Sequence, residues 1–434
     1  MSNPVGRCRA AIAALGLAAG APMWAAEPLS LQQAQRIAAG RSLQLTAQDL
    51  LARAAREQGV AAGQLPDPVL KLGINNLPVS GPDKYSLTRD FMTMRGFAVM
   101  QEITRADKRK ARSGRFEREA EAAQAGRLVA LVNLNRETAM AWLDCHFLGR
   151  MRQLLQTQRV EAGLQVEAAD SAYRAARGAQ ADVFAARQGV AQIDDRIWQT
   201  ERQLATARTR LARWVGDDAS QPLAAPPDLA DVAHHAVTAE GLLAQHPQVA
   251  LMLRQEQIAQ AEVEIAQSNR AADWTVELML SQRGPSFPNM ISLNVSLPLQ
   301  WDQAKRQDRD LAAKLALLEQ LRAQREEAIR EHLGEARAWL QEWHSNRDRL
   351  VHYDTTLLPL AGQRTQAALA AYRGGGGPLP AVLEARRMEI DTRMDRLRLE
   401  MQTAGLWAQI NSLVATEARI AALSGAAAST GQQP

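Results

Sequence analysis

The sequence predicts a mainly α-helical protein with four β-strands, built as two repeats of a strand pair followed by a long helical hairpin. Aromatic residues make up only 4% of the 434 residues, and no proline occurs between Pro82 and Pro222. This composition is typical of long helices and coiled coils. In addition, short segments alternate between apolar and polar residues, and the two halves of the chain correspond to each other. These observations together predict the fold class.

The first 26 residues have the pattern of a secretory signal peptide. Arg7 and Arg9 precede a small apolar run, and the stretch APMWAAEP favours cleavage after Ala26. The mature chain would then keep only Cys145, which excludes an intrachain disulfide.

The two halves correspond most clearly at one pair of matching segments. AYRAARGAQADVFAAR, from Ala172 to Arg187, aligns with AYRGGGGPLPAVLEAR, from Ala371 to Arg386, with seven identities in sixteen positions. We therefore expect a first repeat over residues 27–216 and a second over 235–420. Residues 217–234 have the Pro, Asp and Ala content of a linker, and a flexible tail follows at 421–434.

Four segments have the period of two that is typical of β-strands. They are residues 69–76, 96–103, 273–282 and 290–299. Ile291, Leu293 and Val295, for example, alternate with small or polar residues. One alternative is a small soluble sheet with one face on a helical layer. The other is a set of membrane strands, because each segment has about the nine to eleven residues that a tilted transmembrane strand needs.

The strand count bears on the membrane alternative. After the signal, no window holds about 18 consecutive apolar residues, so a spanning helix is not expected. Four strands cannot close a barrel, since about eight are needed. If the strands span a membrane, several chains must share one barrel.

Long helices follow each strand pair, over about 105–214 and 301–415. The first is expected to extend from about Arg105 to Glu167, or roughly 90 Å at about 1.5 Å per residue. Apolar residues recur in it at spacings of three or four, which predicts an amphipathic stripe that needs helical partners.

Several segments resemble the TolC-type outer-membrane channels of tripartite efflux pumps, and most closely the heavy-metal branch that serves RND pumps. They are LPDPVLKLGINNLP (Leu65 to Pro78), SLTRDFMTMRGFAVMQEI (Ser86 to Ile103) and ADKRKAR (Ala106 to Arg112). The resemblance implies a homotrimer with a twelve-stranded β-barrel in the outer membrane and an α-helical tunnel in the periplasm. It also implies a periplasmic adaptor protein and an inner-membrane RND transporter as partners.

The resemblance further implies functional positions at two places. The two helical turns would meet the adaptor and close the tunnel, through Gly178 and Asp182 in the first turn and through Gly374, Gly375, Gly376, Gly377 and Glu384 in the second. Asp182 and Glu384 could instead simply favour helix N-termini. With four glycines, the second turn is expected to be the more mobile. The polar strand positions would line the pore: Lys71, Asn75, Thr275, Glu277, Ser292, Asn294 and Ser296.

Other candidate sites have simpler interpretations. The basic cluster Lys108, Arg109, Lys110 and Arg112 is interpreted as the solvated start of a helix. Cys145 with His146, and His234 with His235, could be soft-metal ligands, but two adjacent residues do not make a metal site. Met92 and Met94 in the expected external loop are discounted as metal ligands in the same way, so no metal site and no cofactor are expected.

The expected function is a passive outer-membrane channel that exports heavy-metal ions or small toxic compounds. Common enzyme motifs are missing from the sequence, so we do not expect an enzyme. A net charge of +4 with interleaved acids and bases does not suggest nucleic-acid binding. The alternatives are the exit duct of a drug or peptide exporter and, in a different class, a soluble periplasmic coiled-coil adaptor.

Overall fold

The computed structural model describes residues 28–229 and 246–413. The expected signal peptide, the tail at 421–434, His234, His235 and the end of the expected linker lie outside the described residues. Within the described ranges, no helix is long and apolar enough to span a membrane.

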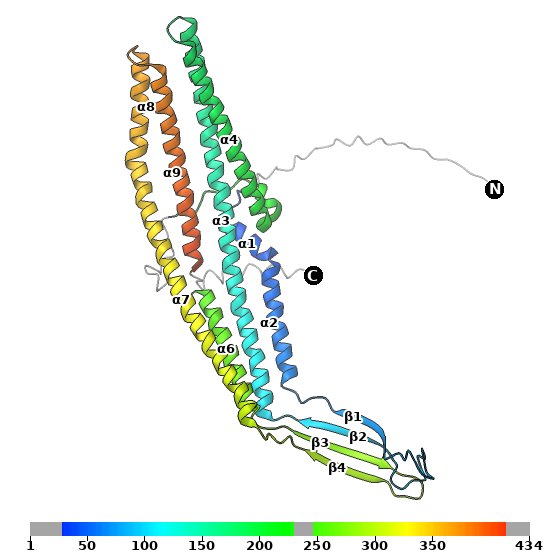
Figure 1. The fold of residues 1–434 in the computed structure, drawn as a ribbon. Coiled ribbons are helices and arrows are strands. Elements are labelled where there is room, and N and C mark those ends of the chain that lie inside the picture. Colours follow the sequence, from blue (N-terminus) through cyan, green and yellow to red (C-terminus); the bar gives the residue numbers. More distant parts are fainter. Residues whose placement is uncertain (1–27, 230–245, 414–434) are drawn as a thin grey trace, which may run out of the picture.

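The molecule is elongated, with a small sheet at one end and two helical turns at the opposite end (Figure 1). The elements in chain order are α1 (Leu31–Arg41), α2 (Leu43–Ala62), β1 (Val69–Asn75), β2 (Met94–Ile103), α3 (Ala106–Arg174), α4 (Gln180–Val215), the 3₁₀ turn η1 (Gly216–Ser220), α6 (Pro247–Ser268), β3 (Trp274–Gln282), β4 (Met290–Ser296), the 3₁₀ turn η2 (Gln303–Lys305), α7 (Gln307–His352), the π-helical turn η3 (Tyr353–Leu357), α8 (Leu358–Arg373) and α9 (Leu379–Leu413). Each half thus contains a strand pair and a long hairpin, as the sequence predicts.

The four strands form one antiparallel sheet in the order β1-β2-β3-β4. The helices next to the sheet follow the same order, because α2 packs on α3, α3 on α6, and α6 on α7. The row of helices therefore continues the row of strands. The two edges of this row are β1 with α2 and β4 with α7.

The main core lies halfway along the helices, where α3, α4, α9 and α1 meet. Trp142 of α3 is fully buried there, and its indole N–H donates to the carbonyl of Leu29 at 3.0 Å. Leu29 also pairs with Leu223, so the segment before α1 is bound to the segment that follows η1. Ala219 and Leu223 contribute to the core. As far as Leu229, the expected linker is therefore packed against the helices.

Three predicted boundaries need correction. The strand predicted over 290–299 ends at Ser296, because Pro298 has no N–H to donate to a neighbouring strand. The long helix after it is interrupted at η3, which ends two residues before Pro359. The proline ring would clash with the carbonyl of Thr355 in a regular α-helix, and the wider π turn accommodates it. Its counterpart α3 continues unbroken to Arg174, beyond the predicted end at Glu167.

Candidate functional site

The predicted pore-facing positions all lie on one face of the sheet, which we call the polar face. Directly paired residues of an antiparallel sheet share a face, and the pairing runs in rungs across the strands. Every second rung belongs to the polar face. One of its rungs contains Lys71, Ala98, Met279 and Ser292, and the neighbouring rung on this face contains Glu277 and Asn294. The remaining predicted positions, Asn75, Thr275 and Ser296, occupy other rungs of the same face.

Three polar side chains interact on this face across three strands. The Lys71 ammonium forms an ion pair with the Glu277 carboxylate by reaching over β2. The Asn294 amide donates to the other oxygen of the same carboxylate at 3.3 Å. Ala98, the residue of β2 in the same rung as Lys71, is small enough to leave room for this contact. Both carboxylate oxygens of Glu277 are therefore engaged.

The opposite face of the sheet is almost entirely apolar and uncovered. Leu72 is 76% exposed, Ile291 73% and Leu293 68%. The other large exposed members of this apolar face are Leu70, Ile74, Phe97, Val99, Ile103, Trp274, Leu278, Leu280 and Val295. A soluble sheet would pack such a face on a helical layer. Exposed apolar patches of this kind mark a surface that another apolar phase or partner covers.

The junction between sheet and helices contains a buried ion pair that the sequence interpretation missed. The Lys108 ammonium lies 2.6 Å from the Asp273 carboxylate, and Lys108 is only 5% exposed. The other oxygen of Asp273 accepts the backbone N–H of Arg105 at 3.1 Å. The interpretation of the basic cluster as a solvated helix start is thus wrong for Lys108. Lys110 and Arg112 are exposed as expected.

The two helical turns have the same hydrogen-bond pattern. In the first, the N–H of Arg177 bonds to Ala172 O at 2.8 Å; in the second, the N–H of Gly376 bonds to Ala371 O at 2.9 Å. Each turn contains one left-handed residue, Ala176 with φ 54° and Gly375 with φ 74°. Both turns are Schellman motifs, which commonly end helices. Of the four glycines in the second turn, only Gly375 has a positive φ.

Replacing Gly375 with alanine is expected to destabilise the second turn by about 1 kcal/mol, since a side chain disfavours the left-handed region. Gly374→Ala is the matched control, because Gly374 has φ −78°. The converse change Ala176→Gly should stabilise the first turn by a similar amount. Hydrogen exchange of the amides in each turn measures these effects. Equal effects of Gly375→Ala and Gly374→Ala would contradict the assignment of Gly375 as the left-handed residue of the second turn.

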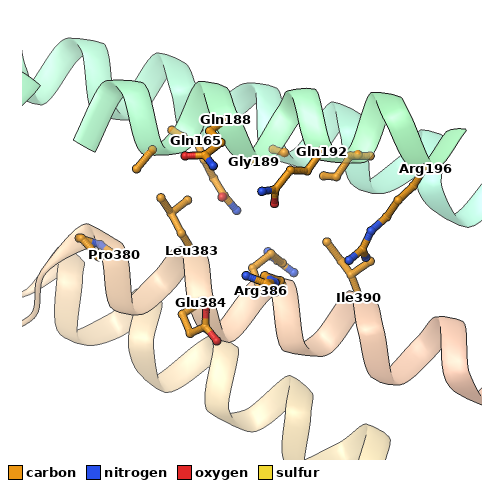
Figure 2. Close-up of a pocket in the computed structure, with 15 residues that line it drawn as sticks. Gln165, Gln188, Gly189, Gln192, Arg196, Pro380, Leu383, Glu384, Arg386 and Ile390 are labelled. Atoms are coloured by element: carbon orange, nitrogen blue, oxygen red, sulfur yellow. The ribbon is translucent and has the colours of Figure 1, made fainter. Parts of the chain in front are cut away.

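The two acids predicted for the turns have different surroundings. The Asp182 carboxylate accepts the N–H of Ala179 at 3.2 Å, so Asp182 caps the start of α4. Glu384 is exposed on α9. It lines the edge of a cavity of about 280 Å³ between the α3–α4 hairpin and α9. Figure 2 shows Leu383 and Ile390 pointing from α9 toward α4, while Glu384 points away from α4.

Beside this cavity lies an ionic cluster that was not predicted. The Glu389 carboxylate is buried and contacts Arg393 at 2.6 Å and Arg386 at 3.3 Å. Arg386 also contacts Glu161 of α3 at 3.3 Å. The spacing of three and four residues in EARRMEIDTR is the signal that could have indicated the contacts within α9. The contact of Arg386 with Glu161 links the second hairpin to the first.

The candidate metal ligands do not form a metal site in the part of the chain that the structure describes, where no group of three His, Cys, Asp or Glu residues could hold an ion. Cys145 is buried in the core. Burial and the neighbouring Asp144 raise the pKa of its thiol to about 11, so the thiolate that a metal requires is disfavoured. The ring of His146 stacks on Trp142.

Comparison with known proteins depends on structure alone, because no protein-family model and no curated sequence matches the chain. The outer membrane protein VceC from Vibrio cholerae is 17% identical with a TM-score of 0.72, and the match covers 88% of this chain and 95% of VceC. The Campylobacter jejuni CmeC outer membrane channel is 12% identical, covers 98% of both chains and has a TM-score of 0.73. This chain has the fold of an outer-membrane channel. CusC, whose structures describe transmembrane channel formation, has the same fold at 15% identity, with a TM-score of 0.74 over 89% of this chain and 92% of CusC.

The outer-membrane channel fold confirms the predicted fold class. These similarities do not distinguish one branch of channels from another, because the three TM-scores differ by only 0.02 between the lowest and the highest.

Proposed function

We propose that the protein is a passive channel of the outer membrane that extends into the periplasm and forms the exit duct of an efflux assembly. The observation that carries this proposal is the uncovered apolar face of the sheet, which lies opposite a polar face on the same strands. A lipid phase would cover the first face, and a water-filled pore would solvate the second. Trp274 and Trp301, the latter 87% exposed, lie at the helical end of the sheet, where an aromatic belt would meet the membrane surface.

The proposed assembly is a homotrimer. The strands β1 and β4 each have an unpaired edge in a single chain, and hydrocarbon does not tolerate unpaired backbone groups. Three copies joined β4 to β1 would close a barrel of twelve strands. The same threefold arrangement would place α7 of one chain against α2 of the next. Exposed leucines on both helices, including Leu50 and Leu317, support such a contact.

The helical hairpins would form a tunnel that ends at the two turns. Their position opposite the sheet is suited to contact with a periplasmic adaptor, which would connect the channel to an inner-membrane RND transporter (Figure 1). Gly178, Asp182, Gly374 to Gly377 and Glu384 are proposed for this contact and for closure of the tunnel. The transporter would supply the energy for export, since the channel itself is not proposed to be an enzyme.

The proposed cargo is heavy-metal ions or small toxic compounds. The sequence resemblance to the heavy-metal branch supports heavy-metal ions as the cargo. It covers the segments Leu65 to Pro78, Ser86 to Ile103 and Ala106 to Arg112. A duct for drugs or peptides would use the same architecture, and tolerance of a deletion strain toward metals and dyes discriminates between these cargoes.

Single-channel recording tests the proposed function. Purified protein reconstituted in a planar bilayer is expected to behave as a trimer and to conduct ions, because the polar face would enclose water. Recovery of a monomer from the soluble periplasm without detergent would contradict the channel and favour the soluble adaptor.

A further inference from the structure

Methionines occupy the polar face of the sheet in a regular arrangement. Met100 lies in the rung with Glu277, Met279 in the rung with Lys71 and Ser292, and Met290 in the rung with Ser281. A fourth, Met94, pairs with Asn75 in the rung nearest the connecting loop. Four successive rungs of the polar face therefore each contain one methionine.

Three of these methionines follow a diagonal across the sheet. Met100 on β2, Met279 on β3 and Met290 on β4 lie on neighbouring strands, and each step is displaced by two residues in the same direction, which keeps it on the polar face. Diagonal neighbours on one face have Cα atoms roughly 7–8 Å apart, which is within reach of long side chains. Adjacent thioethers on this methionine diagonal could therefore approach the same ion.

The apolar face of the four strands has no methionine at all. A thioether is apolar, so lipid would accept it as readily as leucine. The restriction of methionine to the face with Lys71, Glu277 and Asn294 therefore needs another reason than hydrophobicity.

The chemistry of the polar face favours a soft ion of low charge. Thioether sulfur is a soft ligand that selects Cu(I), whereas hard divalent ions prefer carboxylate and carbonyl oxygens. The carboxylate of Glu277 is already engaged by Lys71 and Asn294. Because Lys71 and Glu277 neutralise each other, this pair offers no free carboxylate that would attract a divalent ion.

We propose that Met100, Met279 and Met290 form a path of thioether binding sites for soft monovalent metal ions such as Cu(I) and Ag(I) in the pore. The inference rests on the proposed function, since the polar face must line the pore, and it specifies the cargo. Each adjacent pair of methionines shares one ion, so Met279 belongs to both pairs. Weak sites in series let an ion bind and leave again, as passage through a pore requires.

Silver binding to the purified trimer tests this path, because Ag⁺ does not change oxidation state in the assay. Equilibrium dialysis with metal analysis is expected to show saturable Ag⁺ binding and no comparable Zn²⁺ binding. Met279→Leu, which conserves volume, should weaken Ag⁺ binding at least tenfold because it removes the shared ligand. The control is Met388→Leu, an exposed methionine of α9 whose sulfur contacts Arg364.

Methyl NMR of labelled methionine gives the location of the bound ion independently of the binding assay. Ag⁺ should shift the methyl signals of Met100, Met279 and Met290 and leave that of Met388 in place. Unchanged Ag⁺ affinity in Met279→Leu, or an equal loss in Met388→Leu, would overturn the inference. Conductance of the same samples distinguishes failure of the methionine path from failure of the proposed channel function. Conducting trimers that bind no Ag⁺ would refute the methionine path alone. Protein that never forms conducting trimers would refute the proposed function.

Discussion

Replacing Leu293 with arginine is expected to prevent stable insertion of the trimer into the outer membrane. Leu293 lies at the middle of β4 on the apolar face and is 68% exposed. An arginine on the lipid face at the bilayer midplane costs about 2–4 kcal/mol, and the proposed trimer would contain it three times. The amount of SDS-resistant trimer in the outer-membrane fraction should therefore fall on the order of tenfold or more.

Ser292→Arg is the matched control for this experiment. Ser292 precedes Leu293 on the same strand, and it pairs with Met279 on the polar face. Its arginine would extend into water, so insertion should remain close to that of the unmodified protein. Equal loss of trimer in both variants would contradict the assignment of the apolar face to lipid.

Replacing Asp273 with asparagine is expected to destabilise the junction between sheet and helices by about 3–5 kcal/mol, the usual cost of removing one partner of a buried ion pair. The Lys108 ammonium would be left buried without its counter-charge, although it lies 3.4 Å from the carbonyl of Ala271. Urea unfolding of the detergent-solubilised trimer measures the change in free energy.

Asp107→Asn provides the control for Asp273→Asn. The ion pair of Asp107 with Arg105 is about half exposed on both sides and is screened by water, so its loss should destabilise the protein much less than the loss of Asp273. Combining Asp273→Asn with Lys108→Met should recover most of the stability, because the uncompensated charge is then removed. Similar losses in the two single variants would argue that Lys108 is solvated after all.

The contribution of Asp273 should also depend on pH. Burial tends to raise the pKa of Asp273, but the hydrogen bonds from Lys108 and the Arg105 N–H outweigh it and lower the pKa below its ordinary value. A lowered pKa stabilises the fold above the unfolded value of about 3.9 and loses this effect as the pH falls through the folded pKa. The difference between the unmodified protein and Asp273→Asn should therefore be constant from about pH 5 to 8 and shrink below about pH 4.

Much of the fold could be predicted because its signals are local. The alternation in Ile291, Leu293 and Val295 is visible without knowing the partner strand, since successive side chains of any strand point to opposite faces. The second turn was recognisable because its sequence matches the first, and both share one Schellman geometry. The break before Pro359 was also a local signal, but the helix-forming residues around it concealed it.

The candidate sites were harder to predict, because they depend on residues far apart in the chain. Lys108 and Asp273 are separated by 165 positions, so the basic cluster around Lys108 gave no indication that one of its members is buried. The ion pair of Lys71 with Glu277 spans 206 positions. The methionine diagonal exists only once the register of β2, β3 and β4 is known, since a shift of one residue would move Met279 to the other face.

The sequence by itself determined most helices and strands, the two repeats and the position of the two turns, because periodicity and helix-ending residues act over a few neighbours. Only the tertiary structure decided which face of the sheet stays uncovered, which charges are buried and which methionines share a face. Those properties arise from strand register and from packing between segments that only the fold brings together, so no local pattern contains them.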